Sequence, residues 1–157
     1  MKIIKISLIV VIVVLGLFIS YRSIRGSTES GEELSRAAGT VMVYKSPDCG
    51  CCVNHIAYLR RHGFEVGVVE MNNMPSVKKK FGVTRELESC HTSVFGDYVV
   101  EGHVPIEAIN KLLTEQPDIS GIALPEMPPG SPGMPGIKRA PFVIYTLGKE
   151  KDEFIKI

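Results

Sequence analysis

One stretch of the sequence decides the fold: Val41-Met42-Val43-Tyr44-Lys45-Ser46-Pro47-Asp48-Cys49-Gly50-Cys51-Cys52. The apolar run at its start predicts a buried strand over 41–44, and the polar residues at 46–48 predict a turn and a helix cap. Three of the four cysteines of the chain follow directly, where the next helix begins. The stretch therefore predicts a strand, a turn and a helix, with a sulfur-rich site at the turn.

The segments beyond this unit predict further alternating helices and strands. In chain order they are a helix over 52–62, a strand over 64–71, a short basic helix over 75–81, hairpin strands over 92–95 and 98–101, a helix over 105–115, a Pro/Gly-rich loop over 118–140 and a last, edge strand over 142–147. This order, with a cysteine pair where the first helix begins, is typical of a thioredoxin-like layered α/β fold.

The cysteine cluster can support two kinds of chemistry. Cys49 and Cys52 form a Cys-x-x-Cys pair, which can close a disulfide or bind a soft metal, and Cys51 adds a third sulfur. The unpaired N–H groups and the dipole at a helix start favour the thiolate form. Adjacent cysteines suit bridging between several metal ions, whereas a zinc site normally has two well-separated ligand pairs. The pattern therefore favours copper(I), in a multinuclear cluster, over zinc.

Cys90 and His91 precede the predicted hairpin. In a thioredoxin-like topology the loop that enters this hairpin passes the amino end of the first helix. We therefore expect Cys90 to lie beside the triple-cysteine turn. His91 is interpreted either as a ligand or a hydrogen-bond donor to one, or simply as a polar residue at the start of a strand.

Two methionines extend the candidate ligand set. Met127 and Met134 lie in the Pro/Gly-rich loop, and thioether sulfur is a soft ligand suited to copper(I). Packing in an irregular loop is the alternative role for each.

The other histidines have alternative interpretations. His55 follows Cys52 on the same helix stripe, as a site residue or as a solvated helix residue. His103 precedes Val104-Pro105 and is interpreted chiefly as a cap of the following helix. His62, in the last turn of its helix, complements the helix dipole.

The amino terminus predicts export. Lys2 and Lys5 precede an apolar run over 6–19, and the chain then becomes polar. We expect a signal anchor or a cleaved signal peptide over 1–21, a polar linker over 22–39 and a thioredoxin-like metal-binding domain over 40–157. The predicted location is periplasmic or otherwise extracytoplasmic, with contact to the inner membrane through the first segment.

The formal net charge of +1 and the absence of a long basic run in the sequence argue against a nucleic-acid partner.

Four strings over residues 41–147 resemble the CopG-type periplasmic copper-resistance family, long catalogued as a domain of unknown function. They are Cys49-Gly50-Cys51-Cys52, Ser89-Cys90-His91-Thr92, Val99-Val100-Glu101-Gly102-His103-Val104-Pro105 and Gly130-Ser131-Pro132-Gly133-Met134. Four separated motifs in the same order make the resemblance specific.

The resemblance implies a thioredoxin-like domain that binds copper, with redox cycling of the bound metal and other copper-handling proteins as partners. The ligands that it implies are Cys49, Cys51, Cys52 and Cys90, with His91 and Met127 or Met134 as additional ones.

Two other functions stay open at the level of sequence. In the first, a thiol-disulfide oxidoreductase uses Cys49 as the attacking thiolate and Cys52 as the resolving thiol. In the second, the cysteines form structural disulfides in an interaction module of an oxidising compartment.

Overall fold

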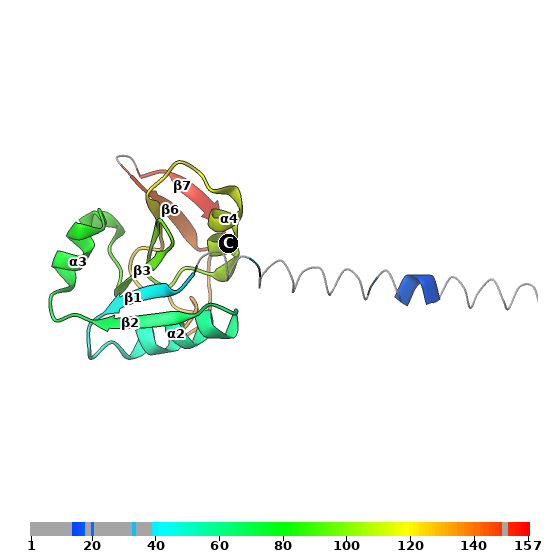
Figure 1. Cartoon of the computed structure of the whole chain (residues 1–157), viewed down its shortest axis with the longest axis horizontal. Coiled ribbons are helices and arrows are strands. Elements are labelled where there is room, and N and C mark those ends of the chain that lie inside the picture. Colours follow the sequence, from blue (N-terminus) through cyan, green and yellow to red (C-terminus); the bar gives the residue numbers. More distant parts are fainter. Residues whose placement is uncertain (1–13, 18–19, 21–32, 34–38, 149–150) are drawn as a thin grey trace, which may run out of the picture.

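The computed structural model describes residues 14–17, 20, 33, 39–148 and 151–157. Its described part contains a seven-stranded sheet of order β2-β1-β3-β4-β5-β6-β7, so the predicted mixed α/β class is confirmed (Figure 1). The elements are β1 (Val41–Lys45), α2 (Gly50–Arg61), β2 (Val66–Glu70), α3 (Met74–Lys80), the 3-10 helix η1 (Arg85–Leu87), β3 (His91–Phe95), β4 (Tyr98–Glu101), α4 (Ile106–Glu115), β5 (Gly121–Ala123), β6 (Val143–Leu147) and β7 (Glu153–Lys156).

Strand direction and register bring three loops together. β1 runs parallel to β2, whereas β3 runs antiparallel to both β1 and β4. Lys45, the last residue of β1, pairs with His91, the first residue of β3, and Thr92 pairs with Glu101 at the end of β4. The segments after β1, before β3 and after β4 therefore meet at the same end of these three strands.

The alternation of side chains along each strand divides the apolar residues between two clusters. One cluster joins buried residues of α2 and α4, such as Leu59 and Leu112, to Val43 and Val100 of the sheet. The neighbouring strand residue, Val99, belongs to a second cluster with Val83, Leu87, Ala123 and Leu147. Helices α2 and α4 therefore cover the same face of the sheet.

Helix α2 follows from the spacing of its buried residues. Cys52, His55, Ile56 and Leu59 are all buried, at the i, i+3, i+4 and i+7 positions of one helix face. Because Cys52 and His55 belong to this stripe, the packing of α2 against the sheet also turns both side chains inward.

The prediction of a last, edge strand over 142–147 is wrong in one respect. β6 occupies this segment but lies between β5 and β7, and β7 is the edge strand. β5 lies inside the segment predicted as a loop, and β7 was not predicted from the sequence. Both strands carry weak local signals, because β5 has only three residues and β7 has charged residues at both of its ends. Residues 124–142 run as a loop.

The predicted membrane-targeting run over 6–19 lies outside the described residues except for 14–17, which are helical. The linker over 22–39 also lies outside them, except for residues 33 and 39. Within the described ranges, no helix has the length and hydrophobicity needed to cross a bilayer.

Candidate metal centre

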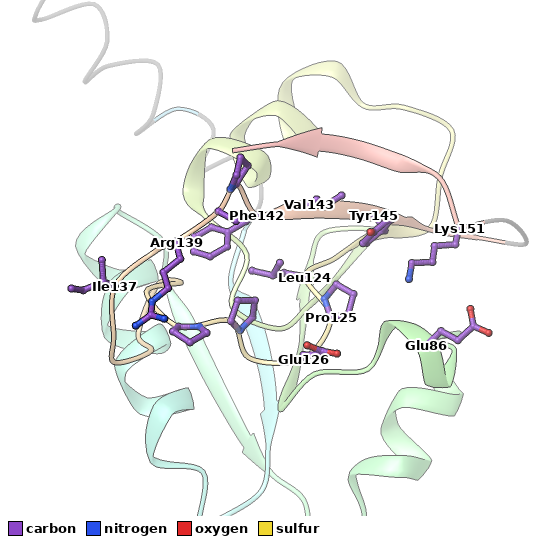
Figure 2. A pocket seen from close by; sticks show the side chains of 14 residues that line it. Glu86, Leu124, Pro125, Glu126, Ile137, Arg139, Phe142, Val143, Tyr145 and Lys151 are labelled. Atoms are coloured by element: carbon purple, nitrogen blue, oxygen red, sulfur yellow. The ribbon is translucent and has the colours of Figure 1, made fainter.

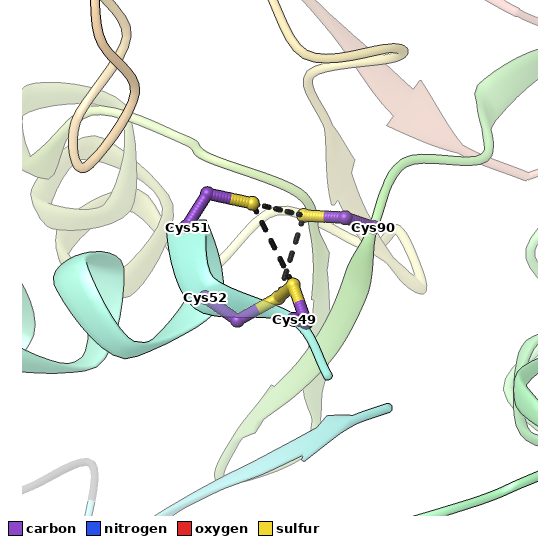
Figure 3. Close-up of side chains that lie close together, drawn as sticks. All are labelled: Cys49, Cys51, Cys52 and Cys90. Atoms are coloured by element: carbon purple, nitrogen blue, oxygen red, sulfur yellow. Dashed lines mark hydrogen bonds between the residues drawn. A yellow bond between two sulfur atoms is a disulfide. The ribbon is translucent and has the colours of Figure 1, made fainter. Parts of the chain in front are cut away.

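Four cysteine sulfurs meet where α2 begins. The Sγ atoms of Cys49, Cys51, Cys52 and Cys90 all lie within 4.8 Å of one another (Figure 3). Cys49 and Cys52 are joined as a disulfide, and Cys51 and Cys90 are free thiols. Sγ of Cys90 lies 3.6 Å from Sγ of Cys52 and 4.0 Å from that of Cys51. The structure thus places Cys90 beside the triple-cysteine turn, as the order of elements led us to expect.

The register of the sheet explains this meeting. Because Lys45 pairs with His91, the turn that follows β1 and the residue that precedes β3 lie side by side at the same end of the two strands. Cys49 is the N-cap of α2, so Cys51 and Cys52 lie in its first turn, where backbone N–H groups and the helix dipole stabilise anionic sulfur. This first turn, all of which the structure describes, contains no acidic residue that would oppose the effect.

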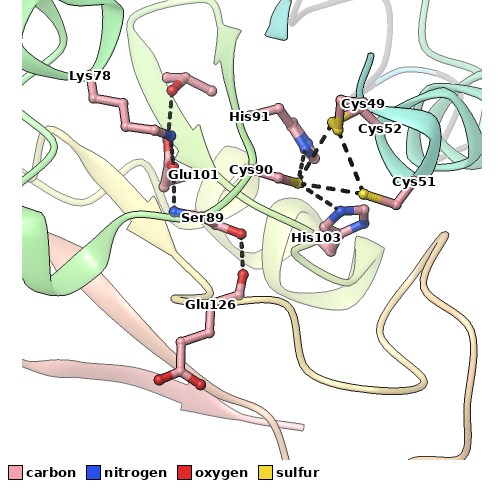
Figure 4. Close-up of polar contacts among 11 residues, drawn as sticks. Cys49, Cys51, Cys52, Lys78, Ser89, Cys90, His91, Glu101, His103 and Glu126 are labelled. Atoms are coloured by element: carbon pink, nitrogen blue, oxygen red, sulfur yellow. Dashed lines mark hydrogen bonds and ion pairs between the residues drawn. A yellow bond between two sulfur atoms is a disulfide. The ribbon is translucent and has the colours of Figure 1, made fainter. Parts of the chain in front are cut away.

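Three buried histidines, His55, His91 and His103, extend the cluster on one side. Figure 4 shows His91 and His103 beside Cys90. Nδ1 of His91 lies 3.2 Å from Sγ of Cys90, and Nε2 of His103 lies 2.9 Å from the same sulfur. Cys90, His91 and His103 thereby form a second group whose potential ligand atoms lie within 4.8 Å of one another. His55 Nδ1 lies 3.1 Å from His91 Nε2, behind this group.

Two interpretations of histidines from the sequence are wrong. His55 is not solvated: its exposed fraction is 0%, because the helix stripe on which it lies faces the sheet. His103 is not the cap of α4: the N-cap is Pro105, and the ring of His103 contacts Cys90 and the carbonyl of Pro132. His62 is the C-cap residue of α2, and its ring packs edge-on against Tyr58.

Burial shifts the protonation of these groups. It raises the pKa of the Cys90 thiol to about 12, and the neighbouring Cys51 adds to the shift. Burial also lowers the pKa of His55 to about 3, lowers that of His91 well below its usual value, and lowers that of His103. The cluster without a cation therefore favours a neutral thiol and neutral imidazoles, and a bound cation would offset the cost of forming the thiolate.

The Pro/Gly-rich loop lies against this centre. His103 Nδ1 lies 2.7 Å from the carbonyl oxygen of Pro132, and the Asn54 side chain donates to the carbonyl of Gly133. A Cβ atom at Gly133, whose φ is +84°, would lie 2.6 Å from the backbone nitrogen of His55. Only glycine permits this backbone conformation and this close approach without strain. The loop therefore fixes the ring of His103 from the side opposite Cys90.

The two methionines of the loop lie in different surroundings. Met134 lines a shallow hollow with Asn54, Ala57 and Arg61 of α2. Met127 is 47% exposed. The predicted ligand role of each methionine stays a prediction.

A buried ion pair supports the segment that carries Cys90. Glu101 pairs with Lys78 and accepts hydrogen bonds from the backbone N–H of Ser89, at 2.7 Å, and from the Thr92 hydroxyl, at 2.6 Å (Figure 4). Burial raises the pKa of Glu101, and the Lys78 ammonium opposes this shift. The Ser89 hydroxyl also donates to the carbonyl of Glu126.

This ion pair was not predicted from the sequence. Lys78 stands in a run of three lysines, and such a run is usually solvated. The only local signal of a buried charge was Glu101, an acidic residue at the end of a predicted strand and directly before Gly102.

A separate cavity of about 440 Å³ lies beside the Pro/Gly-rich loop and β6 (Figure 2). Its lining is mainly apolar and proline-rich, with charged residues at Glu86, Glu126, Arg139 and Lys151. The four cysteines are not among the residues that line it.

The fold and the site define a class: small α/β proteins in which four cysteine sulfurs meet at the start of a helix. Residues 87–134 match the family model described as "Protein of unknown function, DUF411". No curated protein matches the chain.

Two solved structures, described as copper resistance protein CopG in Form 1 and Form 2, are each 36% identical to this chain. Each alignment covers 75% of this chain, with 96% and 97% of the respective structures covered and TM-scores of 0.69 and 0.70. The chain therefore belongs to the CopG-type family.

Proposed function

We propose that this protein binds copper(I) through Cys49, Cys51, Cys52 and Cys90 and acts in copper homeostasis or resistance. The observation that carries the proposal is the convergence of four cysteine sulfurs within 4.8 Å of one another where α2 begins. The relatives described as copper resistance proteins support copper as the metal. Thiolate sulfur is a soft ligand that prefers copper(I), and the helix start stabilises its charge.

The donor set supports more than one ion per chain. A single tetrahedral ion would use all four sulfurs and leave the nitrogens of His91 and His103 beside Cys90 without a cation. A thiolate can bridge two copper ions, so Cys90 is suited to be shared between the sulfur cluster and the histidine group. Met127 and Met134 are proposed as additional ligands because of their soft sulfur and their place in the loop that contacts His103.

The disulfide supports redox cycling as part of this function. Two copper(II) ions can each accept one electron from the reduced Cys49 and Cys52 pair. This pair then becomes a disulfide and releases two protons, and two copper(I) ions are formed. An external thiol reductant restores the dithiol. In this state Cys51 and Cys90 are still free thiols.

The strand order β2-β1-β3-β4, with β1 and β2 parallel and β3 antiparallel to β1 and β4, supports a thioredoxin-like fold for residues 40–157. We propose these residues as the metal-binding domain.

We propose residues 1–21 as the export segment and 22–39 as a linker, with the domain in the periplasm or another extracytoplasmic space. Protease protection of the domain in intact cells, lost when the outer envelope is opened, tests this location.

Anaerobic titration tests the copper proposal. The reduced full chain is titrated with copper(I) against a chromogenic competitor, and bound copper is counted per chain. We expect more than one ion per chain, fewer for Cys51→Ser, and an unchanged count for His62→Gln, whose side chain lies at the far end of α2. A reduced chain that binds no copper(I) overturns the proposal.

The Cys49–Cys52 disulfide also favours a second function, thiol-disulfide exchange with other exported proteins. Metal-free protein that reduces a disulfide substrate repeatedly, equally well with Cys51→Ser, would support this function. It would leave the third sulfur without a role in exchange.

A further inference from the structure

Hydrogen bonds determine which ring nitrogen carries the hydrogen in two of the histidines around Cys90. A backbone carbonyl can only accept a hydrogen bond, so a ring nitrogen that bonds to one must donate. His55 Nε2 lies 3.4 Å from the carbonyl oxygen of Val104, and His103 Nδ1 lies 2.7 Å from that of Pro132. Both of these nitrogens therefore carry a hydrogen.

The tautomer of His91 follows from that of His55. His55 is fully buried, and its ring nitrogens contact a carbonyl and a second imidazole, so the neutral form with one ring hydrogen is favoured. Its Nδ1 then carries a lone pair and lies 3.1 Å from Nε2 of His91. Because this Nδ1 can only accept a hydrogen bond, His91 must donate one from Nε2. Its Nδ1 therefore presents a lone pair to Sγ of Cys90, at 3.2 Å.

We infer that His55 is a positioning residue, which directs the Nδ1 lone pair of His91 at the sulfur of Cys90. The neutral ring of His103 donates from Nδ1 to Pro132, so its Nε2 carries a lone pair, 2.9 Å from that sulfur. Two lone pairs then converge on a thiol that has one hydrogen to donate, and a bound cation satisfies both. Only this last step rests on the proposed function, with copper(I) as the cation. The tautomers are properties of the metal-free protein.

Nuclear magnetic resonance of the reduced, metal-free full chain tests the inference. Long-range ¹H–¹⁵N correlation distinguishes a protonated from an unprotonated ring nitrogen. We expect His91 to carry its hydrogen on Nε2 in the unmodified protein and in His55→Asn, because the asparagine oxygen can take the place of Nδ1 as acceptor. In His55→Leu this acceptor is lost, and we expect hydrogen on Nδ1 of His91, donated to Cys90.

A second measurement connects the tautomer to the metal. We expect His55→Leu to weaken copper(I) binding by about 10- to 100-fold, the usual effect of losing a residue that orients a ligand. His55→Asn keeps the affinity close to that of the unmodified protein, and His62→Gln on the same helix serves as the matched control.

Two outcomes overturn the inference: hydrogen on Nδ1 of His91 in the unmodified protein, or unchanged hydrogen on Nε2 in folded His55→Leu. If His55→Leu does not fold, the inference is tested by the unmodified protein and by His55→Asn, and hydrogen on Nδ1 of His91 in either of them overturns it. If these tautomers are as expected but no variant binds copper(I), the proposed function fails while the role of His55 stands.

Discussion

His103 Nε2 lies 2.9 Å from Sγ of Cys90, although the two residues belong to different loops. The hairpin of β3 and β4 creates this contact, because Thr92 pairs with Glu101 and the chain leaves β4 beside the point where it enters β3. A hydrogen bond from the backbone N–H of Gly102 to the carbonyl of His91 extends the pairing by one step. The imidazole is therefore part of the same rigid unit as the sulfur.

Replacement of His103 tests this contact. His103→Leu removes both the ring nitrogen beside Cys90 and the hydrogen bond to Pro132. We expect copper(I) affinity to fall by about 10- to 100-fold, as measured by competition with a chromogenic chelator. His62→Gln is the control. An affinity equal to that of the unmodified protein would show that His103 takes no part in binding.

Gly133→Ala tests the docking of the Pro/Gly-rich loop. The alanine Cβ would lie 2.6 Å from the His55 backbone, and the φ of +84° disfavours it further. We expect a loss of about 1 to 3 kcal/mol in the free energy of unfolding, measured in urea, together with weaker copper(I) binding because His103 loses its support.

Gly96→Ala is the matched control for this variant. Gly96 also has a positive φ, of +58°, but an added Cβ meets nothing within 4 Å. It should lose stability through backbone strain while keeping its copper(I) affinity. Equal copper affinities in the two variants would contradict a role of the loop at the centre.

Lys78→Met tests the buried ion pair. It leaves the Glu101 carboxylate buried without its cation, and we expect a loss of about 3 to 5 kcal/mol in the free energy of unfolding. The double variant Lys78→Met/Glu101→Gln should regain part of this loss, because the uncompensated charge is gone.

The exposed pair of Lys111 and Glu115 provides the comparison, and Lys111→Met should cost less than about 1 kcal/mol. If Lys78→Met and Lys111→Met have the same effect in urea, the buried pair does not stabilise the segment that carries Cys90.

Cys49→Ser tests which cysteine forms a disulfide with Cys52 when Cys49 is absent. Sγ of Cys90 lies 3.6 Å from that of Cys52, closer than it lies to that of Cys51. On mild oxidation of the metal-free variant we expect a Cys52–Cys90 disulfide, identified by peptide mapping without reduction. Cys51→Ser should instead keep the Cys49–Cys52 disulfide. A Cys51–Cys90 product from Cys49→Ser would show that helix α2 presents the other sulfur to Cys90.

The sequence predicted the centre best where the signal was local. The strand before Ser46 and the helix after the turn depend on neighbouring residues, so the turn with three cysteines could be identified directly. The element order then placed Cys90 beside it. The helix cap predicted at 46–48 was wrong: Cys49 is the N-cap of α2, and its side chain makes no cap hydrogen bond. The cap role of His103 and the solvated alternative for His55 were wrong, because both residues have a plausible local role and burial depends on what packs against them.

By itself, the sequence determined the order of the first elements and the presence of a sulfur-rich turn, because caps, periodicity and the Cys-x-x-Cys spacing act over a few residues. Tertiary structure alone decided that His91, His103 and His55 form a buried chain behind Cys90, that Lys78 faces Glu101, and that β7 closes the sheet. These features arise from cross-strand register and from the exclusion of water between distant segments, and neither is encoded in any short stretch of the chain.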